Sequence, residues 1–581
     1  MSQGRHEPLA LIILAIGCSF VLVTTGLAVL VAPLGDSYHY EMPAFWIQHQ
    51  TIAPFVVHNP RIISVSFAGE ALALPGHMYL RGPAIMFVLT LLASLLIIWI
   101  VYSLARQLGC SFGQSLCAAA LTPAYGTMAL SIFINHVDLL WTGVWSGACL
   151  MFLVQCRSDT VGVRKYMYLL GIAVYCFALA CGTKNITLLS APLFALCLVL
   201  LGRQLWRPRL LAALAVLGLG GMIISGMLWN YTANQIWFGD FRGSTFMREH
   251  VSSDLSPVAI WTRSCRGMMI LLFDTEFVPA SMQSIRRKAC KGFLQLMGAN
   301  HVLAEDEGFY QLNETSFAPR QGLGLLGIVF FMPGVAVGTV MCMKRRQNVS
   351  GMNPFRRRKC FVLVLFCTGT FLFGHAFLRW QSIGILRLLP LFLIAGAPLC
   401  AFLFGKRWLR LVALVMLLVS TWLYGVFMIG MTVRRVDLAS GQPWFAQLAR
   451  LQQVHNVTVD CQWKNDPVEK LAAREVHYTK RELYLALLRY LPKPVTIGVV
   501  GGSNTEIVWL FGPHYQNRII PLVDCRQPER VLAPPEKCQF VVVDGKKVTT
   551  FDDWAAAHGF LIVFQATQDQ KRLLAVYERK P

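Results

Sequence analysis

Three acidic residues lie beside apolar segments, where a carboxylate is costly unless it has a partner or a function. Asp36 directly follows the first long apolar segment, Glu70 lies further along the same polar stretch, and Asp138 begins another apolar segment. We expect all three at one face of a membrane. Carboxylates gathered in a polar pocket can act as a general base towards a hydroxyl group, or can bind a cation.

Each carboxylate also has a simpler interpretation. Asp138 could cap the N-terminus of its helix, because that end of a helix favours Asp. Asp36 could be a solvated loop residue, and Glu70 could be exposed or could cap a helix. The sequence leaves both kinds of interpretation open.

Basic residues are expected at the same face. Lys184 lies in a Gly-Thr-Lys-Asn break between two apolar segments, and Arg379 precedes another apolar segment that contains Arg387 about one helical turn inside. A buried arginine needs a partner or an anion, and its forked guanidinium group suits phosphate. The alternative for Lys184 and Arg379 is that their charged ends reach the membrane interface.

The elements that position these residues are expected to be membrane-spanning helices. Of the 581 residues, 55% are hydrophobic and only 14% are charged, whereas soluble proteins carry about a quarter charged residues. The apolar segments have about the length that crosses the hydrocarbon core as a helix, the structure that satisfies its own backbone there. The sequence predicts about eleven spans, near 9–32, 83–104, 112–132, 138–155, 166–181, 185–202, 209–229, 321–343, 360–378, 383–404 and 409–431.

The distribution of positive charge indicates the orientation of the chain. Lys and Arg cluster in alternate short connections, most densely within 344–359, which places these connections and the N-terminus in the cytoplasm. Two long segments, 33–82 and 230–320, then lie outside, and so does the C-terminus. The net charge of +22 therefore reflects membrane topology, and we expect no nucleic-acid partner.

The composition changes after residue 431. Residues 432–581 are polar enough to be soluble, and short apolar strands alternate with helical stretches, which predicts an extracytoplasmic α/β domain after a transmembrane module at 1–431. The expected strands are near 495–500, 519–523, 540–543, 561–564 and 573–577, and the expected helices near 479–490 and 551–558.

Metal and disulfide chemistry has little support in the sequence. The 17 cysteines form no CxxC pair, and most lie within apolar segments. The 13 histidines include no HExxH motif, so no dedicated catalytic metal is indicated. Cys525 and Cys538 could form a disulfide in an extracytoplasmic domain.

An ordered series of motifs resembles the type-C integral-membrane glycosyltransferases (GT-C), above all bacterial relatives of the protein O-mannosyltransferases and of the lipid A aminoarabinose transferase. A departure is Glu41, where relatives usually have His. The landmarks are Asp36 with Tyr40, Pro43 and Trp46; Ala-Gly-Glu ending at Glu70; Asp138; Gly182-Thr183-Lys184; Asn230 with Phe238-Gly239-Asp240; Arg379-Trp380-Gln381 with Arg387; and Ile497-Gly498-Val499 with Glu506.

The resemblance implies a polytopic α-helical GT-C-like fold in a membrane, expected to be the bacterial inner membrane. It also implies an inverting transfer of a sugar from a polyprenyl-phosphate donor to a hydroxyl of an acceptor glycan, lipid or protein. Asp36 would be the general base and Lys184 and Arg387 would stabilise the leaving phosphate. No cofactor would be required, although a divalent cation could bind near the acidic residues. The further substrate-binding residues would be Arg379, Arg61, Tyr40, Glu70 and Asp138.

Two other classes of protein stay open. A transporter or flippase of a lipid-linked saccharide would be expected to have repeated halves with broken helices, and the sequence shows no such repeat. A scaffold or receptor would account for the terminal domain, but not for an arginine within a span.

Overall fold

The structure is a computed structural model in which part of the chain is described. The described residues are 7–31, 38–64, 67–80, 84–133, 136–156, 163–200, 208–248, 254–273, 283–299, 323–343, 354–378, 390–433, 455–461, 476–478, 494–501, 508–511, 516–544, 551–568 and 571–580.

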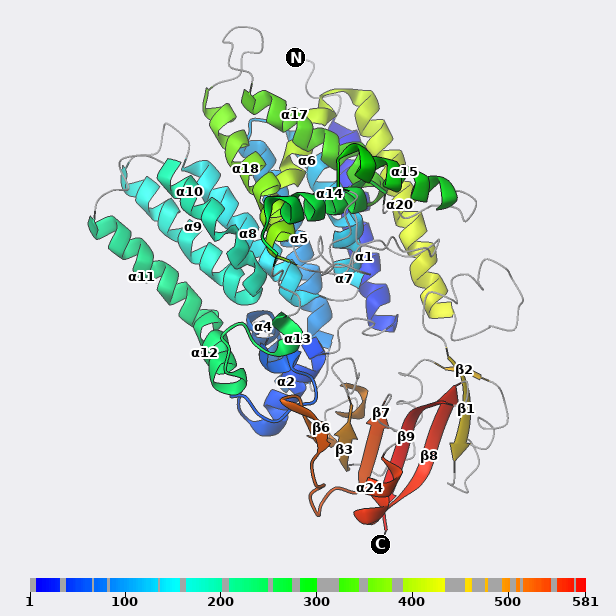
Figure 1. The fold of residues 1–581 in the computed structure, drawn as a ribbon. Coiled ribbons are helices and arrows are strands. Elements are labelled where there is room, and N and C mark those ends of the chain that lie inside the picture. The colour runs from blue at the N-terminus through cyan, green and yellow to red at the C-terminus, as the bar shows by residue number, and fades with distance from the viewer. Residues whose placement is uncertain are drawn as a thin grey trace.

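The larger part of the protein is a bundle of apolar helices (Figure 1). Within the described residues, seven helices are long and apolar enough to cross a membrane, and two bent pairs bring the number to as many as nine. The chain is a multi-pass integral membrane protein. The long helices include α1 (Glu7–Val31), α5 (Ala84–Gln107), α8 (Val137–Gln155), α9 (Val163–Thr183), α17 (Met332–Met343, continuing α16 Gly324–Leu326 and η7 Gly327–Phe331), α18 (Pro354–Phe377) and α20 (Arg407–Val433).

The predicted spans coincide with these helices, but the structure revises their number. Two predicted spans, near 185–202 and 383–404, correspond to shorter apolar helices at Asn185–Val199 and Pro390–Gly405. Two others are bent pairs. The elements concerned are η3 (Asn185–Ser190), α10 (Ala191–Leu200), α19 (Pro390–Gly396), η8 (Ala397–Gly405), α6 (Phe112–Leu121), η2 (Thr122–Ala124), α7 (Gly126–Phe133), α11 (Pro208–Ile224) and α12 (Met227–Phe238).

The two bends have local causes. The 59° bend between α6 and α7 follows Pro123, and Tyr125 there adopts an extended backbone conformation, since proline disfavours continuation of a helix. The 61° bend between α11 and α12 lies at Gly226, whose φ of 70° is left-handed. A Cβ atom on Gly226 would also lie 2.3 Å from the ring of Phe67. Glycine therefore suits this bend for two reasons.

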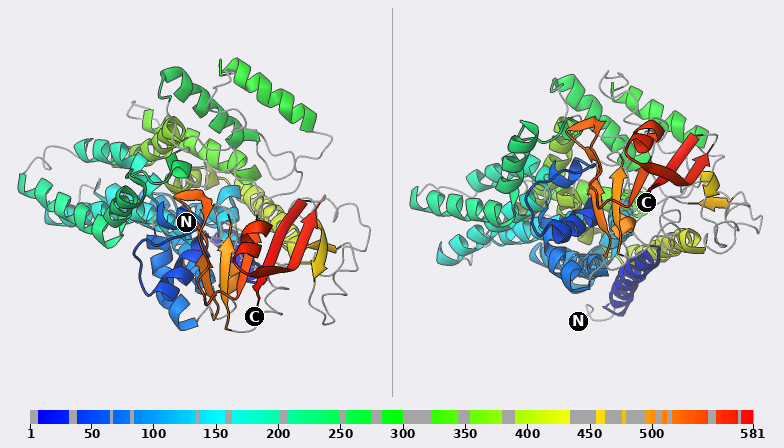
Figure 2. Two further views of the ribbon diagram at one scale, coloured as in Figure 1. Left: turned by 60° about the horizontal axis from the view of Figure 1, so that its bottom comes forward. Right: turned by 90° about the horizontal axis from the view of Figure 1, so that it is seen from below.

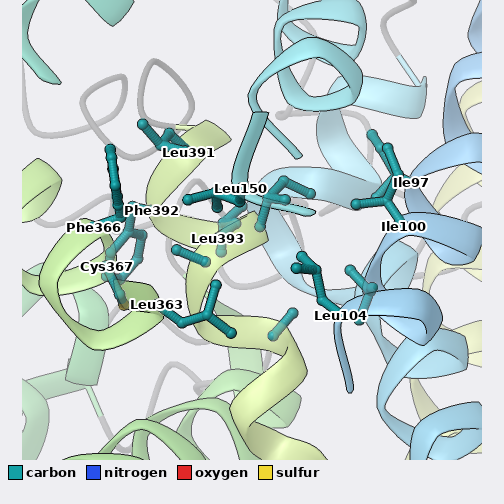
Figure 3. Close-up of a cluster of buried hydrophobic side chains, with 14 of the residues drawn as sticks. Ile97, Ile100, Leu104, Leu150, Leu363, Phe366, Cys367, Leu391, Phe392 and Leu393 are labelled. Carbon is teal, nitrogen blue, oxygen red and sulfur yellow. The ribbon is translucent and has the colours of Figure 1, made fainter. Parts of the chain in front are cut away.

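Helix α8 is at the centre of the bundle. It packs against α5 and α9, and also against α18 and α19. Figure 3 shows side chains of α5, α8, α18 and α19 converging, with Leu150 of α8 between Ile100 and Phe392. Gly147 permits this approach, because a Cβ atom there would lie 2.7 Å from Ile100. The position of the N-terminal end of α8 is therefore fixed from several sides.

The C-terminal part forms a mixed sheet of seven strands in the order β2-β1-β8-β9-β7-β3-β4. Strands β7, β3 and β4, at one end of this order, are parallel, and β9, β8 and β1 continue the sheet in antiparallel pairs. The strands are β1 (His455–Cys461), β2 (Val476–Tyr478), β3 (Thr496–Val500), β4 (Arg518–Pro521), β7 (Phe540–Asp544), β8 (Phe560–Gln568) and β9 (Lys571–Arg579), with a separate pair β5 (Val523–Asp524) and β6 (Gln527–Val531).

This sheet agrees with the predicted α/β character. All five predicted strands are present, and α24 (Asp552–Ala557) corresponds to the helix expected near 551–558. Strands β1, β2 and β6 were not predicted, and the helix expected near 479–490 lies outside the described residues. Cys525 and Cys538 are free thiols, so the suggested disulfide is not formed. The boundary at 431/432 stays a prediction, because residues 434–454 also lie outside the described part.

Alternate side chains of the sheet serve two different cores. Val500, Val543 and Tyr577 pack with α24. On the opposite face, Ile497 and Val542 share one hydrophobic cluster with the segment that follows α1, here called the α2–α4 segment, which contains α2 (Tyr38–His49), α3 (Arg61–Ser64) and α4 (Ala68–Leu80). Figure 2 shows the sheet beside α2 in both views.

Polar contacts reinforce this junction. The side-chain amide of Gln48 donates to the carbonyl of Ile519 at 2.7 Å and accepts the Ile519 N–H at 2.8 Å. It thereby caps the free edge of β4, which is a terminal strand of the sheet. The Cys525 N–H donates to the Val57 carbonyl at 2.8 Å, and the Arg526 guanidinium lies 4.2 Å from the Trp237 ring centroid. The sheet therefore contacts the α2–α4 segment in two ways, through the apolar face of the sheet and through the free edge of β4.

Loss of the Gln48 amide is expected to weaken this attachment. In Gln48→Ala the backbone N–H and C=O of Ile519 lose their side-chain partners, at a cost of about 1–3 kcal/mol. Hydrogen exchange followed by mass spectrometry should show faster exchange at β4. The control is Gln50→Gly, because Gln50 is exposed and has a left-handed φ of 54° that glycine adopts readily. Unchanged exchange at β4 in Gln48→Ala would contradict the role of this contact.

Candidate functional site

Ionisable side chains gather where α2, α4 and α8 meet the break after α9. They are His39 on α2, Glu70 on α4, Asp138 on α8, His136 just before α8, and Lys184 in the break. Glu70 and Asp138 have no exposed surface, and even Lys184 is only 8% exposed. We call these five residues the buried ionic cluster.

Asp138 is the centre of the buried ionic cluster. Its Oδ2 accepts a hydrogen bond from the Lys184 ammonium group, while its Oδ1 lies 3.6 Å from His39 Nε2 and 4.0 Å from His136 Nδ1. His39 contacts Glu70 Oε1 through its other ring nitrogen, Nδ1. His39 therefore bridges the two carboxylates, and the network connects all four segments.

Two glycines allow these segments to approach. A Cβ atom on Gly69 would lie 2.8 Å from the Asp138 Cα, so only glycine lets the start of α4 lie against the start of α8. A Cβ atom on Gly182 would lie 1.8 Å from the Ser225 hydroxyl oxygen. Gly69 precedes Glu70, and Gly182 lies two residues before Lys184. The Ala-Gly-Glu and Gly-Thr-Lys motifs thus combine a charged residue with the close packing that buries it.

The charges of the buried ionic cluster compensate one another. Burial alone would lower the pKa of the His39 imidazole, but the neighbouring Asp138 and Glu70 carboxylates outweigh it, and the pKa is raised above its ordinary value. The two carboxylates thus favour the cationic form of His39, and the Lys184 ammonium group lies against Asp138 as a second positive group. Such balance matters because an unpaired buried charge is strongly destabilising.

Two carboxylate oxygens of this network have spare capacity. Asp138 Oδ1 and Glu70 Oε2 are buried and accept no hydrogen bond from the part of the chain that the structure describes. Buried acceptors of this kind are costly unless a ligand or water completes them. They are suited to accept hydrogen bonds from substrate hydroxyl groups or to bind a cation.

A divalent cation has one candidate set of ligands within the described residues. His39, His136 and Asp138 each offer an atom, and these atoms lie within 4.8 Å of one another. Imidazole and carboxylate are ligands that Zn²⁺ and Mn²⁺ accept. Because the His39 pKa is raised, a cation at this nitrogen would have to displace its proton. The sequence indicated no such set, because His39 lies about a hundred residues before His136 and Asp138.

A second buried pair joins α2 to the segment that follows it. Glu41 Oε2 is 3.5 Å from His58 Nε2, and both side chains are buried. Glu41 is the position at which the resembling enzymes usually have His. Its pairing with His58 connects α2 to the segment that follows it. A glutamate at this position can therefore be buried, because His58 lies against it.

The motif around Asn230 also joins distant segments. Asn230 is buried, and its side-chain amide donates to the Ile63 carbonyl at 3.0 Å, which holds α12 against α3. Asp240, just after α12, accepts hydrogen bonds from Arg242, which lower its pKa, and Arg248 lies 3.3 Å away. Asn230 therefore joins α12 to α3, and Asp240 joins the turn after α12 to the residues that follow it.

The structure brings together three of the predicted site residues, Glu70, Asp138 and Lys184. It bears on the simpler interpretation of each, although Glu70 still lies in the first turn of α4, where a carboxylate favours the helix end. His136, not Asp138, is the N-cap residue of α8, Glu70 is buried, and Lys184 makes an ion pair instead of reaching the interface. An ion pair between Lys184 and Asp138 was not predicted.

Of the other predicted site residues, the structure describes Arg61 and the backbone of Tyr40. Arg61 is the first residue of α3 and is half-buried, with its backbone N–H bonded to the Asn59 side chain at 3.0 Å. Tyr40 lies in α2, and only its backbone is described. Asp36, Arg379 and Arg387 lie outside the described residues.

Sequence reasoning missed His39 and His136 as site residues. The available signal was their position: His39 lies three residues after Asp36, and His136 two residues before Asp138. Histidine beside a carboxylate at the end of an apolar segment is unusual enough to have been considered.

Comparison with solved structures extends this description. The chain is similar to ArnT from Cupriavidus metallidurans bound to undecaprenyl phosphate, with 14% identity, a TM-score of 0.53 and 97% of each chain covered. The apo form of that protein gives 12% identity and a TM-score of 0.50, covering 96% of this chain and 97% of that one. The archaeal oligosaccharyltransferase AglB from Archaeoglobus fulgidus, with an inhibitory peptide and a dolichol-phosphate, gives 12% identity and a TM-score of 0.40, covering 95% and 74%.

The similarity is one of fold. No protein-family profile matches the sequence, and no curated protein matches it either. The chain nevertheless has a GT-C fold over almost its whole length, including the C-terminal sheet. The predicted fold class and the predicted structural resemblance are confirmed.

The ion pair of Lys184 with Asp138 can be tested by a double-mutant cycle. Lys184→Gln and Asp138→Asn each leave a buried charge without its partner, so each should lower the free energy of unfolding by about 3–5 kcal/mol. The double variant should lose less than the sum of the two. Thermal unfolding in detergent provides the measurement. The comparison pair is the half-exposed Arg242 with Asp240, whose coupling in the same cycle should be smaller, because solvent screens it. Strict additivity in the buried pair would argue against direct coupling.

Proposed function

We propose that the protein is an inverting glycosyltransferase that acts at the outer face of the membrane in which it is embedded. It transfers a sugar from a polyprenyl-phosphate donor to a hydroxyl group of an acceptor. The observation that carries this proposal is the buried ionic cluster, with spare oxygens on Asp138 and Glu70, within a fold similar to that of ArnT bound to undecaprenyl phosphate.

In this proposal each residue has a separate role in the reaction. Asp36 accepts the proton of the acceptor hydroxyl, whose oxygen attacks the anomeric carbon as the bond to the donor phosphate breaks. Arg387, with Arg379, binds the departing phosphate, and Lys184 contributes positive charge beside Asp138. Stabilisation of developing charge is often the largest contribution to catalysis. Asp138 and Glu70 orient the hydroxyl groups of the sugar, with Arg61 and Tyr40 nearby in the chain.

The topology proposed from the charge distribution agrees with this assignment. The buried ionic cluster lies on segments at the end of the bundle that faces the sheet, opposite the N-terminus (Figure 1). We propose that this end is extracytoplasmic and that the membrane is the bacterial inner membrane. Donors linked to lipid are then required, because nucleotide sugars are cytoplasmic.

The alternative function is transport of a lipid-linked saccharide. The bent pairs α6–α7 and α11–α12 favour it, since transporters use broken helices. The densely packed, charge-balanced cluster favours chemistry instead, because a charged group confined to one end of the bundle provides no path across it. Reconstituted vesicles distinguish the two: a flippase moves the donor lipid between leaflets unchanged, whereas a transferase releases polyprenyl phosphate.

Asp36→Asn tests the proposed base. The variant should fold normally and lose about 10²–10⁴-fold in turnover, which is the usual contribution of a general base. The measurement is release of free polyprenyl phosphate by mass spectrometry, from a panel of polyprenyl-phosphate sugars. Asp553→Asn is the control, because Asp553 is an exposed carboxylate on α24. Full turnover in Asp36→Asn would remove Asp36 from the mechanism.

We further propose that no cofactor is required, although His39, His136 and Asp138 can bind a divalent cation. Protein treated with a chelator should retain turnover, because the proposed phosphate-binding residues are themselves cationic. Zn²⁺ titrated into the same protein should bind, and His136→Ala should weaken that binding at least about tenfold, as loss of one ligand or its support does. Loss of turnover on chelation, restored by added metal, would show instead that the cation is essential.

A further inference from the structure

A cavity of about 800 Å³ opens where several strands of the C-terminal sheet begin or end. Its volume is within the size range of ligand-binding pockets. The first residues of the parallel strands β3, β4 and β7 and the last residues of β9 line it. These strand ends lie beside the C-terminus of the chain, where β9 finishes (Figure 1). The GT-C fold and the buried ionic cluster do not account for this cavity.

The lining of the cavity combines hydrogen-bond donors and acceptors. Arg518, Lys537 and Lys580 offer cationic donors, whereas Glu536 and Glu578 offer carboxylate acceptors. None of these five makes a salt bridge to another residue in the described part of the chain. Arg579 differs, because its guanidinium group donates to the carbonyls of Cys538 and Pro535. Five charged side chains are therefore free to bind a ligand.

This chemistry selects for a polyhydroxy compound. Each sugar hydroxyl both donates and accepts, so adjacent hydroxyl groups can bond a carboxylate on one side and an ammonium or guanidinium group on the other. A strongly anionic ligand, such as a nucleotide, would bond the cationic side chains but would leave Glu536 and Glu578 facing like charge. A purely apolar ligand would leave all the lining charges without partners.

The position of the cavity connects it to the buried ionic cluster. Arg518 lines the cavity, and the next residue, Ile519, is the one that the Gln48 side chain binds. The following residue of α2, His49, has its pKa lowered by burial and by the charge of Arg518. His39 lies ten residues earlier on the same helix, which corresponds to about 15 Å along its axis. A chain of a few sugar units is long enough to cover this distance.

We propose that this cavity binds a saccharide, and that it holds the non-reacting part of an oligosaccharide acceptor while another hydroxyl group of the same molecule reaches the buried ionic cluster. The description of this saccharide as the acceptor rests on the proposed function. The presence of a saccharide site does not.

The binding experiment uses the full-length protein in detergent and needs no donor. Maltotriose, chitotriose, mannotriose and inorganic phosphate are each titrated by calorimetry. At least one trisaccharide should bind at millimolar concentration or below, and Glu578→Gln and Lys537→Gln should each weaken that binding about tenfold, by loss of a charged hydrogen bond. The control Asp553→Asn should bind as the unchanged protein does. Binding of phosphate alone, or trisaccharide binding that both variants leave unchanged, would overturn the proposal.

A second measurement separates the two proposals. With a donor that is turned over, Glu578→Gln should raise the acceptor KM about tenfold and leave kcat and the donor KM unchanged. A reduced kcat with an unchanged acceptor KM would show that the cavity does not hold the acceptor. If no donor is turned over, the glycosyltransferase proposal fails, and the calorimetric result still decides whether the cavity binds saccharide.

Discussion

The ion pair between Lys184 and Asp138 is the constraint on which the rest of the site depends. A carboxylate without exposed surface is tolerated only where a positive charge lies against it, and the Lys184 ammonium group that meets Asp138 is 46 residues away in the sequence. The break after α9 must therefore meet the start of α8. His39 then adds a second contact to Asp138 and carries Glu70 into the same network. The packing of α8 against its neighbours in the bundle keeps this meeting point in place.

Helix α2 connects this network to the C-terminal sheet. Its first turn carries His39 into the buried ionic cluster, and its last turn carries Gln48 onto the edge of β4. Between them, Phe45 packs against Phe511, with ring centroids 5.1 Å apart, inside a core that belongs to both parts of the chain. A short helix with a function at each end is a rigid spacer. It fixes the distance between the buried ionic cluster and the sheet.

The sequence predicts the helices well and the site only in part, for physical reasons. Long apolar segments have few alternatives to a membrane-spanning helix, so their positions agree with the structure, whereas the bends at Pro123 and Gly226 shorten some of them. Lys184, Asp138 and Glu70 were identifiable because charge beside an apolar segment is costly. Their pairing was not identifiable, because it depends on which helices lie side by side. His39 and His136 were missed for the same reason, and β1 because its partner β8 lies about a hundred residues later.

The order in which the chain is synthesised gives the buried ionic cluster a further consequence. His39, Glu41 and Glu70 emerge from the ribosome long before Asp138 and Lys184. Within this early segment His39 pairs with Glu70 and His58 with Glu41, so its two glutamates have partners before Asp138 and Lys184 are made. The last part of the sheet is made later still, and it covers the opposite face of α2. The segment 38–80 is thus made early with its own pairs of histidine and glutamate, and it reaches its final packing only when Asp138, Lys184 and the sheet are complete.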